Sequence, residues 1–196
     1  MRQVNIGCIV MAAGNAMRFG TNKLKAVLEG KSLILRALEA VPRDDFGAVT
    51  VVTQYPEIRQ LAQERGFTAV VNTRPELGLS HTIALGLQTM PKMDAVLFQV
   101  ADQPLLKRES VAGLVAFYRR HPDDIAALGH DGARGNPCIF PAAFFPELLA
   151  LRGDHGGSTV IRQHRDKLLL WEVPPQELTD VDTPETLAAL RRDTEK

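Results

Sequence analysis

Cysteine is scarce in this sequence: the 196 residues include two, Cys8 and Cys138, each within an apolar run. No group of cysteines and histidines has the spacing of a zinc site, and two distant cysteines do not make a disulfide framework. A free cysteine in an apolar run behaves as a small hydrophobic side chain. We therefore expect two buried, reduced thiols.

An excess of charge of either sign is also missing, because 23 basic and 23 acidic residues cancel. This balance argues against a basic nucleic-acid surface and against a polybasic patch for membranes. Neither nucleic acid nor membrane is therefore expected as a partner. Any site for an anion has to be assembled locally from a few residues.

Long hydrophobic runs are missing as well. No apolar segment approaches the ~20 residues that span a bilayer, and residues 7–13 are too few for the apolar region of a signal peptide. A cytoplasmic protein is therefore expected. Hydrophobic residues still make up 45% of the chain, which is enough for a sizeable core, and the length fits a single domain over residues 1–196.

Strand and helix patterns alternate along the first 120 residues. Short β-branched or apolar runs predict strands, and the periodic segments between them predict helices. The predicted strands are 4–12, 48–53, 67–71 and 94–100, and the predicted helices are 32–41, 56–65, 80–90 and 108–120. This alternation predicts a three-layer α/β/α, Rossmann-like fold with a mostly parallel sheet.

The pattern becomes less regular after residue 121. The predicted strands there are 125–128, 137–140 and 168–173, and the predicted helices are 144–151, 158–164 and 184–192. We expect this part to add strands at one edge of the sheet, some of them antiparallel. It would also cover one side of a cleft at the carboxyl ends of the strands, where ligands bind in such sheets.

The first predicted strand ends in three small residues, Ala12, Ala13 and Gly14, and the loop continues to Arg18 and Lys23. Small residues let backbone amides approach phosphate oxygens, and the two cations supply positive charge. The glycine spacing fits neither the P-loop nor the G-x-G-x-x-G dinucleotide motif. The loop therefore predicts a third kind of polyphosphate site; the alternative is that both cations are ordinary solvated surface residues.

Three aspartates could hold a metal ion. Asp102 directly follows the mostly apolar run 94–101 that contains the predicted strand 94–100, and so it lies at the ligand-binding edge. Asp180 and Asp182 alternate in an extended segment, which places both side chains on one face. Carboxylates together with phosphate oxygens are ligands that Mg²⁺ prefers. Helix capping or turn formation is the alternative role for these residues.

Three further loops offer small or polar groups that could contact substrates. They contain Gly78 and Ser80, Asn136 and Pro137, and Asp154 and Gly156. A helix start such as 78–80 exposes amides that bind phosphate or a base, and an asparagine can both donate and accept hydrogen bonds. Plain capping and a structural turn explain the first two loops equally well.

The ordered set of motifs resembles one family. M-A-A-G-x-x-x-R-F-G-x-x-K at 11–23 resembles the signature of nucleotidyltransferases with the glycosyltransferase-A-like fold, and A-D-Q-P at 101–104 resembles their metal motif. V-V-N…G-L-S at 70–80, G-N-P at 135–137, G-D-x-G at 153–156 and D-V-D-T-P-E at 180–185 follow in the family's order. The chain is most similar to the molybdenum cofactor cytidylyltransferase group, because the guanylyl-transferring relatives carry a second glycine in place of Ala13.

The resemblance implies Mg²⁺-dependent transfer of CMP from CTP to the phosphate of molybdopterin, with release of pyrophosphate. A molybdenum hydroxylase would use the product. Residues 1–120 would form the nucleotide-binding half and residues 121–196 the acceptor-binding half.

The resemblance also implies roles for individual residues. Catalysis would involve Arg18, Lys23 and Asp102. The nucleotide would be bound by Ala12, Ala13, Gly14, Arg18, Lys23, Asn72, Gly78, Ser80 and Asp102. The acceptor would be bound by Asn136, Pro137, Asp154 and Gly156, and the metal by Asp102 together with Asp182 or Asp180.

Two departures from the family pattern concern the substrates. Gly157 and Ser158 stand where many members have Ala-Arg, and His81 stands where a second serine is usual. Two alternatives therefore stay open: transfer to another phosphorylated acceptor, and a non-catalytic protein that binds the cofactor and inserts it into a hydroxylase. The presence of Lys23, Asp102 and Asp182 favours an enzyme, because a pure binder does not need all three.

Overall fold

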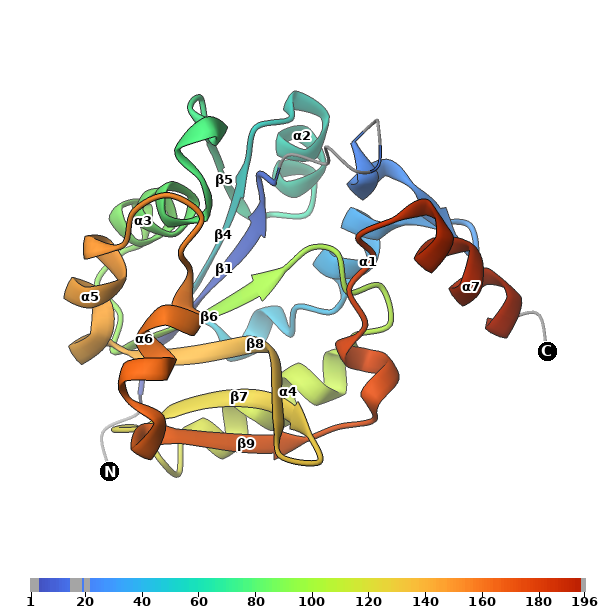
Figure 1. Ribbon diagram of the computed structural model, residues 1–196. Helices are drawn as coiled ribbons and strands as arrows, with labels where there is room; N and C mark the ends of the chain where they lie inside the picture. The colour runs from blue at the N-terminus through green and yellow to red at the C-terminus, as the bar shows by residue number, and fades with distance from the viewer. Residues whose placement is uncertain (1–3, 15–18, 20–21, 195–196) are drawn as a thin grey trace.

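A seven-stranded sheet with helices on both faces forms the body of the protein in the computed structural model (Figure 1). The structure describes residues 4–14, 19 and 22–194. Of residues 193 and 194 it describes the backbone alone. The strands of the sheet are β1 (Ile6–Ala12), β4 (Ala48–Thr53), β5 (Thr68–Val71), β6 (Ala95–Val100), β7 (Ile125–His130), β8 (Ala133–Pro141) and β9 (Leu168–Glu172). The α-helices are α1 (Leu33–Glu39), α2 (Pro56–Glu64), α3 (Leu79–Thr89), α4 (Arg108–Tyr118), α5 (Phe145–Ala150), α6 (Gly157–Gln163) and α7 (Pro184–Thr194).

The sheet is mostly parallel, and its strand order is β5-β4-β1-β6-β8-β7-β9. β1 lies between β4 and β6 and is parallel to both, while β8 is antiparallel to β6 and β7. The expected fold class is confirmed, with one added detail. The antiparallel strand is inserted inside the added part of the sheet, and the outermost strand β9 is parallel to its neighbour β7.

Alternating side chains of the buried strands face two helical layers. In β1, Cys8 and Val10 pack in the cluster that includes residues of α1, α2 and α4, while Ile9 packs with residues of α3, α5 and α6. A strand covered on both faces reads as a continuous apolar run, which is why its sequence shows no polar alternation. Cys8 and Cys138 are both free and buried, as expected.

A small additional sheet lies beside α7. β2 (Val27–Leu28) and β3 (Lys31–Ser32) pair with each other, and a third apolar cluster joins Leu28 and Leu33 to Val181 and Leu187. This pair of two-residue strands was not predicted, because each is too short for a periodic pattern. The cluster fixes the start of α7 next to the segment that follows β1. Among the described residues, every helix is too short or too polar to span a lipid bilayer.

Candidate active site

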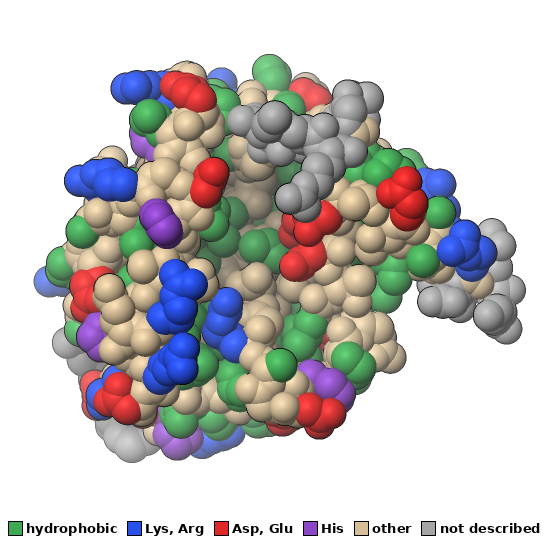
Figure 2. Space-filling model, in the orientation of Figure 1, with side chains coloured by type: hydrophobic (Ala, Val, Ile, Leu, Met, Phe, Trp, Pro, Cys, Tyr) green, Lys and Arg blue, Asp and Glu red, His purple; other side chains and the backbone are tan. Residues whose placement is uncertain are grey.

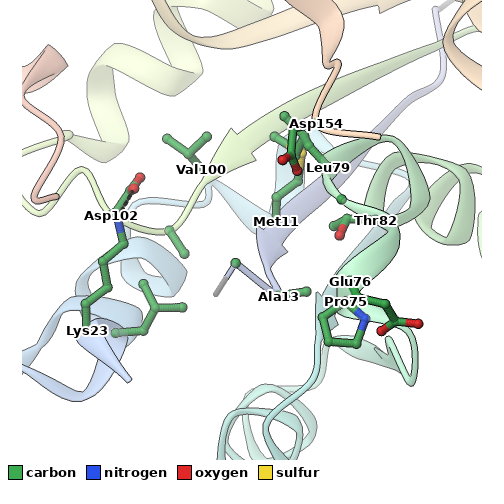
Figure 3. A pocket seen from close by; sticks show the side chains of 14 residues that line it. Met11, Ala13, Lys23, Pro75, Glu76, Leu79, Thr82, Val100, Asp102 and Asp154 are labelled. Atoms are coloured by element: carbon green, nitrogen blue, oxygen red, sulfur yellow. Dashed lines mark hydrogen bonds and ion pairs between the residues drawn. The ribbon is translucent and has the colours of Figure 1, made fainter. Parts of the chain in front are cut away.

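A cleft of about 500 Å³ opens at the carboxyl ends of β1 and β6. Met11 and Val100, from the ends of these strands, form its floor (Figure 3). Lys23 and Asp102 lie on one side, and the short helix η3 (Pro75–Leu77), the start of α3 and Asp154 lie on the other. Figure 2 shows the same hollow from outside, with acidic side chains at one border. The cleft lies where ligands bind in parallel sheets.

Three consecutive side chains at the end of β4 hold the backbone of the loop after β1. The hydrogen bonds join Thr53 Oγ1 to the carbonyl of Ala12 (3.0 Å), Gln54 Nε2 to that of Ala13 (2.9 Å) and Tyr55 Oη to that of Gly14 (3.2 Å). In a planar trans peptide the carbonyl oxygen and the following amide hydrogen point in opposite directions. The amides of Ala13 and Gly14 therefore point away from these three side chains. This anchoring was missed from the sequence, because residues 53–55 carry no motif.

The ammonium group of Lys23 bridges two carboxylates. Its Nζ lies 2.7 Å from Asp102 Oδ2 and 2.9 Å from Asp182 Oδ1. Burial lowers the pKa of Lys23, but the charges and hydrogen bonds of the two aspartates outweigh this effect and raise it above its ordinary value. The lysine is therefore fully charged at neutral pH. The structure thus brings together three of the residues that the sequence singled out.

Hydrogen bonds join the loop after β6 to the segment before α7, and thereby place Asp182 beside Asp102. They run from Val181 N to Asp102 O (2.9 Å), from Gln103 Nε2 to Leu178 O (3.3 Å) and from Lys107 N to the Glu177 carboxylate (3.1 Å). Glu177 is 2% exposed, which is unusual for a carboxylate and shows that its role is structural. Gln103 and Glu177 were not predicted as site residues, since nothing in the sequence links them to partners 70 or more residues away.

The two aspartates before α7 share one face, as the alternation predicted. Val181 is fully buried between them, while Asp180 and Asp182 are exposed. Partial desolvation, followed by the charges of Asp102 and Asp182, raises the pKa of Asp180 to about 6, against the lowering effects of Gln103 and Lys23. Asp180 therefore lies close enough to the other two aspartates for their charges to raise its pKa.

The donor set around Lys23 fits a hard divalent cation. Oxygens of Asp102 and Asp182 converge on one point, which the Lys23 ammonium occupies. Within the part of the chain that the structure describes, no group of three or more His, Cys, Asp or Glu side chains is arranged for a metal. Mg²⁺ usually takes one or two carboxylates and completes its shell with water and substrate phosphates. Two carboxylates are thus sufficient here.

The opposite wall depends on Gly78. Its φ angle is +82°, and a Cβ at this position would lie 2.5 Å from the backbone carbon of Gly153 and 2.6 Å from Asp154 Oδ1. The amide of Ser80 donates a hydrogen bond to the carbonyl of Gly153 (3.1 Å). Only glycine permits both this conformation and this close approach. The start of α3 and the 153–156 loop therefore form one continuous wall, on which Gly78 and Asp154 face the cleft.

A second cavity of about 130 Å³ adjoins the cleft. Met11, Leu79 and Val100 line both spaces and separate them. Asn136 and Gly156, two of the four residues expected to contact the acceptor, line this second cavity.

The other predicted residues that the structure describes do not line the cleft or the second cavity. Pro137 and Ser80 are buried and are not among the residues that line either space. Asn72 is 1% exposed and donates through Nδ2 to Thr82 Oγ1 (3.2 Å), so it supports Thr82, which lines the cleft. Arg18 lies outside the described residues.

This mostly parallel sheet, with a lysine between two carboxylates at the carboxyl ends of its central strands, has the architecture of a nucleotidyltransferase. The chain belongs to the family described as the MobA-like NTP transferase domain, whose model matches residues 8–168. The expected enzyme class and family are thereby confirmed, and enzymes of this family commonly use a divalent metal ion.

Known proteins resemble the chain over nearly its whole length. The purine catabolism protein PucB of Bacillus subtilis is 27% identical, and the match covers 98% of both chains. The crystal structure of Rv0371c from Mycobacterium tuberculosis superposes with a TM-score of 0.81 at 18% identity, covering 97% of this chain and 100% of that one. A nucleotidyl transferase from Methanothermobacter, Mth528, gives 0.79 at 20% identity, covering 96% and 97%. Rv0371c has also been solved as a complex with manganese.

Proposed function

We propose that this protein transfers CMP from CTP to the phosphate of a molybdopterin-type acceptor, with Mg²⁺ as cofactor and pyrophosphate as the second product. The observation that carries the proposal is the Lys23 ammonium between Asp102 and Asp182, at the border of a cleft that also contains Ala13 and Gly14. Ala13 favours a cytidine nucleotide through the resemblance described above. The adjoining cavity of about 130 Å³ supplies space for one ring of the acceptor.

The reaction needs little covalent chemistry from the protein. An oxygen of the acceptor phosphate attacks the α-phosphorus of CTP, a new P–O bond forms, and the bond to the β-phosphate breaks as pyrophosphate leaves. Positioning and neutralisation of charge therefore supply most of the rate enhancement. In this proposal the amides of Ala13 and Gly14 bind phosphate oxygens, and Lys23 leaves its aspartate partners to neutralise charge at the α-phosphate. Arg18 would contact the leaving pyrophosphate.

Asp102 and Asp182 are the residues that would hold the metal, with Asp180 as the alternative second ligand. When bound, Mg²⁺ supplies charge neutralisation and a template that orients phosphates. Asn72 supports the cleft from below through Thr82 in this proposal, rather than touching the nucleotide. Ser80 supports it through its bond to Gly153.

The names of the relatives agree with this assignment. The family takes its description from MobA, and one structural neighbour is a molybdopterin-guanine dinucleotide biosynthesis protein A. Another is a CMP-sugar-acid synthetase solved with CTP. The Bacillus relative is named for purine catabolism. The resemblance described above makes a molybdenum hydroxylase the proposed user of the product.

The test is pyrophosphate release from purified protein. CTP, GTP, ATP and UTP are each offered with molybdopterin and Mg²⁺, and then CTP is offered with sugar and polyol phosphates. The proposal predicts release with CTP and molybdopterin above all other pairs. Preference for a sugar phosphate would establish the alternative acceptor. Tight binding of molybdopterin without pyrophosphate from any nucleotide would instead indicate a carrier or insertion protein.

A further inference from the structure

The lining of the second cavity is mostly apolar. Most of its wall consists of aliphatic and aromatic side chains, including Phe98, Phe140 and Leu148. Its polar or weakly polar side chains are those of Arg134, Asn136, Cys138 and Ser158. A cavity with apolar walls and a few convergent polar groups is typical of a site for a small molecule.

Arg134 is the charged residue of this cavity. Its side chain is half-buried, and its Nη1 donates to the carbonyl of Gly135 (3.2 Å) and to Cys138 Sγ (3.3 Å). Within the described residues no carboxylate lies within ion-pair distance of it. The half-buried Arg36, by contrast, has its charge balanced by Glu29 at 2.6 Å.

A partly desolvated guanidinium without a counter-charge is unfavourable unless an anion completes the site. The planar guanidinium suits phosphate, because two N–H groups can bind two oxygens at once. In Arg134 one terminal nitrogen is engaged by neutral acceptors, and no bond from the other to a described residue is present.

We propose that Arg134 binds the phosphate of the acceptor, and that the apolar walls of the second cavity hold the planar ring of that molecule. This inference rests on the proposed function and specifies its acceptor as an aromatic or heteroaromatic phosphate monoester. The shared wall of Met11, Leu79 and Val100 makes the two spaces adjoin, so an acceptor seated in the second has its phosphate close to a nucleotide in the first.

The experiment measures equilibrium binding by calorimetry with two probes, phenyl phosphate and molybdopterin. Wild type is compared with Arg134→Gln, Arg134→Lys and the control Arg162→Gln, which alters an exposed arginine of α6 that is not among the residues lining either cavity. We expect Arg134→Gln to bind both probes about 10- to 100-fold more weakly. Arg134→Lys should bind both probes with an affinity between those of wild type and Arg134→Gln, because it keeps the charge and loses the bidentate geometry. Arg162→Gln should match wild type, and all four proteins should bind CTP alike.

In turnover assays Arg134→Gln should raise KM for the acceptor and leave KM for CTP unchanged. Equal binding of phenyl phosphate by wild type and Arg134→Gln would overturn the inference, as would a wild type that does not bind this probe at all. CTP affinity and melting temperature show whether each variant is folded. If Arg134→Gln does not fold, the comparison is made with Arg134→Lys. Arg134-dependent binding of phenyl phosphate without binding of molybdopterin would support the role of Arg134 and refute the proposed acceptor.

Discussion

The Nζ atom of Lys23 lies 2.7 Å from Asp102 Oδ2, although the two residues are 79 positions apart in the sequence. The contact joins the loop after β1 to the loop after β6, the two strands that form the floor of the cleft. The Lys23 ammonium thus contacts the carboxylate that would hold a divalent cation in the proposed mechanism. In that mechanism lysine and metal would compete for Asp102 until a triphosphate engages the lysine.

Replacing Lys23 should have opposite effects on metal binding and on catalysis. Lys23→Met removes the competing charge, so Mn²⁺ should bind the nucleotide-free protein about 10-fold more tightly, as measured by electron paramagnetic resonance. The same change should slow pyrophosphate release by about 10²–10³-fold, because a transition-state charge contact is lost. Lys25→Met is the control, since Lys25 is exposed and pairs with Glu57. An unchanged rate in Lys23→Met would refute its assigned role.

Substitution of the aspartates should identify the second metal ligand. Asp102→Asn should abolish metal-dependent turnover while circular dichroism stays that of wild type. Of Asp180→Asn and Asp182→Asn, the second should weaken Mn²⁺ binding more, because Asp182 shares the Lys23 ammonium with Asp102. The opposite ranking would assign the ligand role to Asp180. Normal turnover of Asp102→Asn with Mg²⁺ would contradict the metal site altogether.

Loss of the Tyr55 hydroxyl should weaken nucleotide binding with little effect on the chemical step. Tyr55→Phe removes the hydrogen bond to Gly14 O, so the loop is less well ordered before CTP binds. A neutral hydrogen bond contributes about 0.5–1.5 kcal/mol, which predicts a KM for CTP raised about 2- to 13-fold with kcat nearly unchanged. Tyr118→Phe removes a comparable bond, to Pro122 O at 2.8 Å, far from the cleft. The control should lower the melting temperature and leave KM as it was.

The alkaline stability of the protein should depend on Cys8. Burial raises the pKa of this thiol well above its ordinary value, whereas in the unfolded chain it ionises near pH 8.5. The folded state therefore holds the proton where the unfolded state releases it, so this contribution is complete below pH 8.5 and falls as pH rises. The expected loss approaches about 1.4 kcal/mol per pH unit. Urea unfolding at pH 8, 9 and 10 should show a flatter dependence for Cys8→Ala; identical slopes would contradict the argument.

Much of the fold could be predicted because the strands of the main sheet and the helices beside them carry local signals, which the two-residue strands β2 and β3 do not. β1 is a continuous apolar run, and α1 is preceded by the capping residue Ser32, whose hydroxyl accepts a hydrogen bond from the amide of Leu35. The sheet order beyond β6 could not be predicted, since it depends on where β8 pairs. Strand pairing across a sheet is set by packing of distant segments rather than by the composition of either strand.

The candidate site likewise contains residues that could be predicted from the sequence and residues that could not. Lys23, Asp102 and Asp182 could be proposed from motif order, and the structure places them within hydrogen-bonding distance. The supporting residues of the site could not be proposed, because their partners are backbone atoms. Residues 53–55 bind the carbonyls of Ala12 to Gly14, and Gln103 binds the carbonyl of Leu178. Every amino acid has a backbone carbonyl, so the sequence does not mark the position of such a partner.

The base preference should respond to the methyl group of Ala13. This side chain is 4% exposed and lines the cleft beside Gly14, so its removal enlarges the nucleotide side of the cleft by one methyl group. The resemblance associates a second glycine at this position with guanylyl transfer. Ala13→Gly should therefore raise kcat/KM for GTP relative to CTP, by roughly 10-fold if the discrimination is that of one methyl-sized contact in a pocket. The ratio is measured by competition between the two nucleotides in one reaction, which cancels any general loss of activity. An unchanged ratio would show that the base is selected elsewhere, and the start of α3, on the opposite wall, is then the segment to alter.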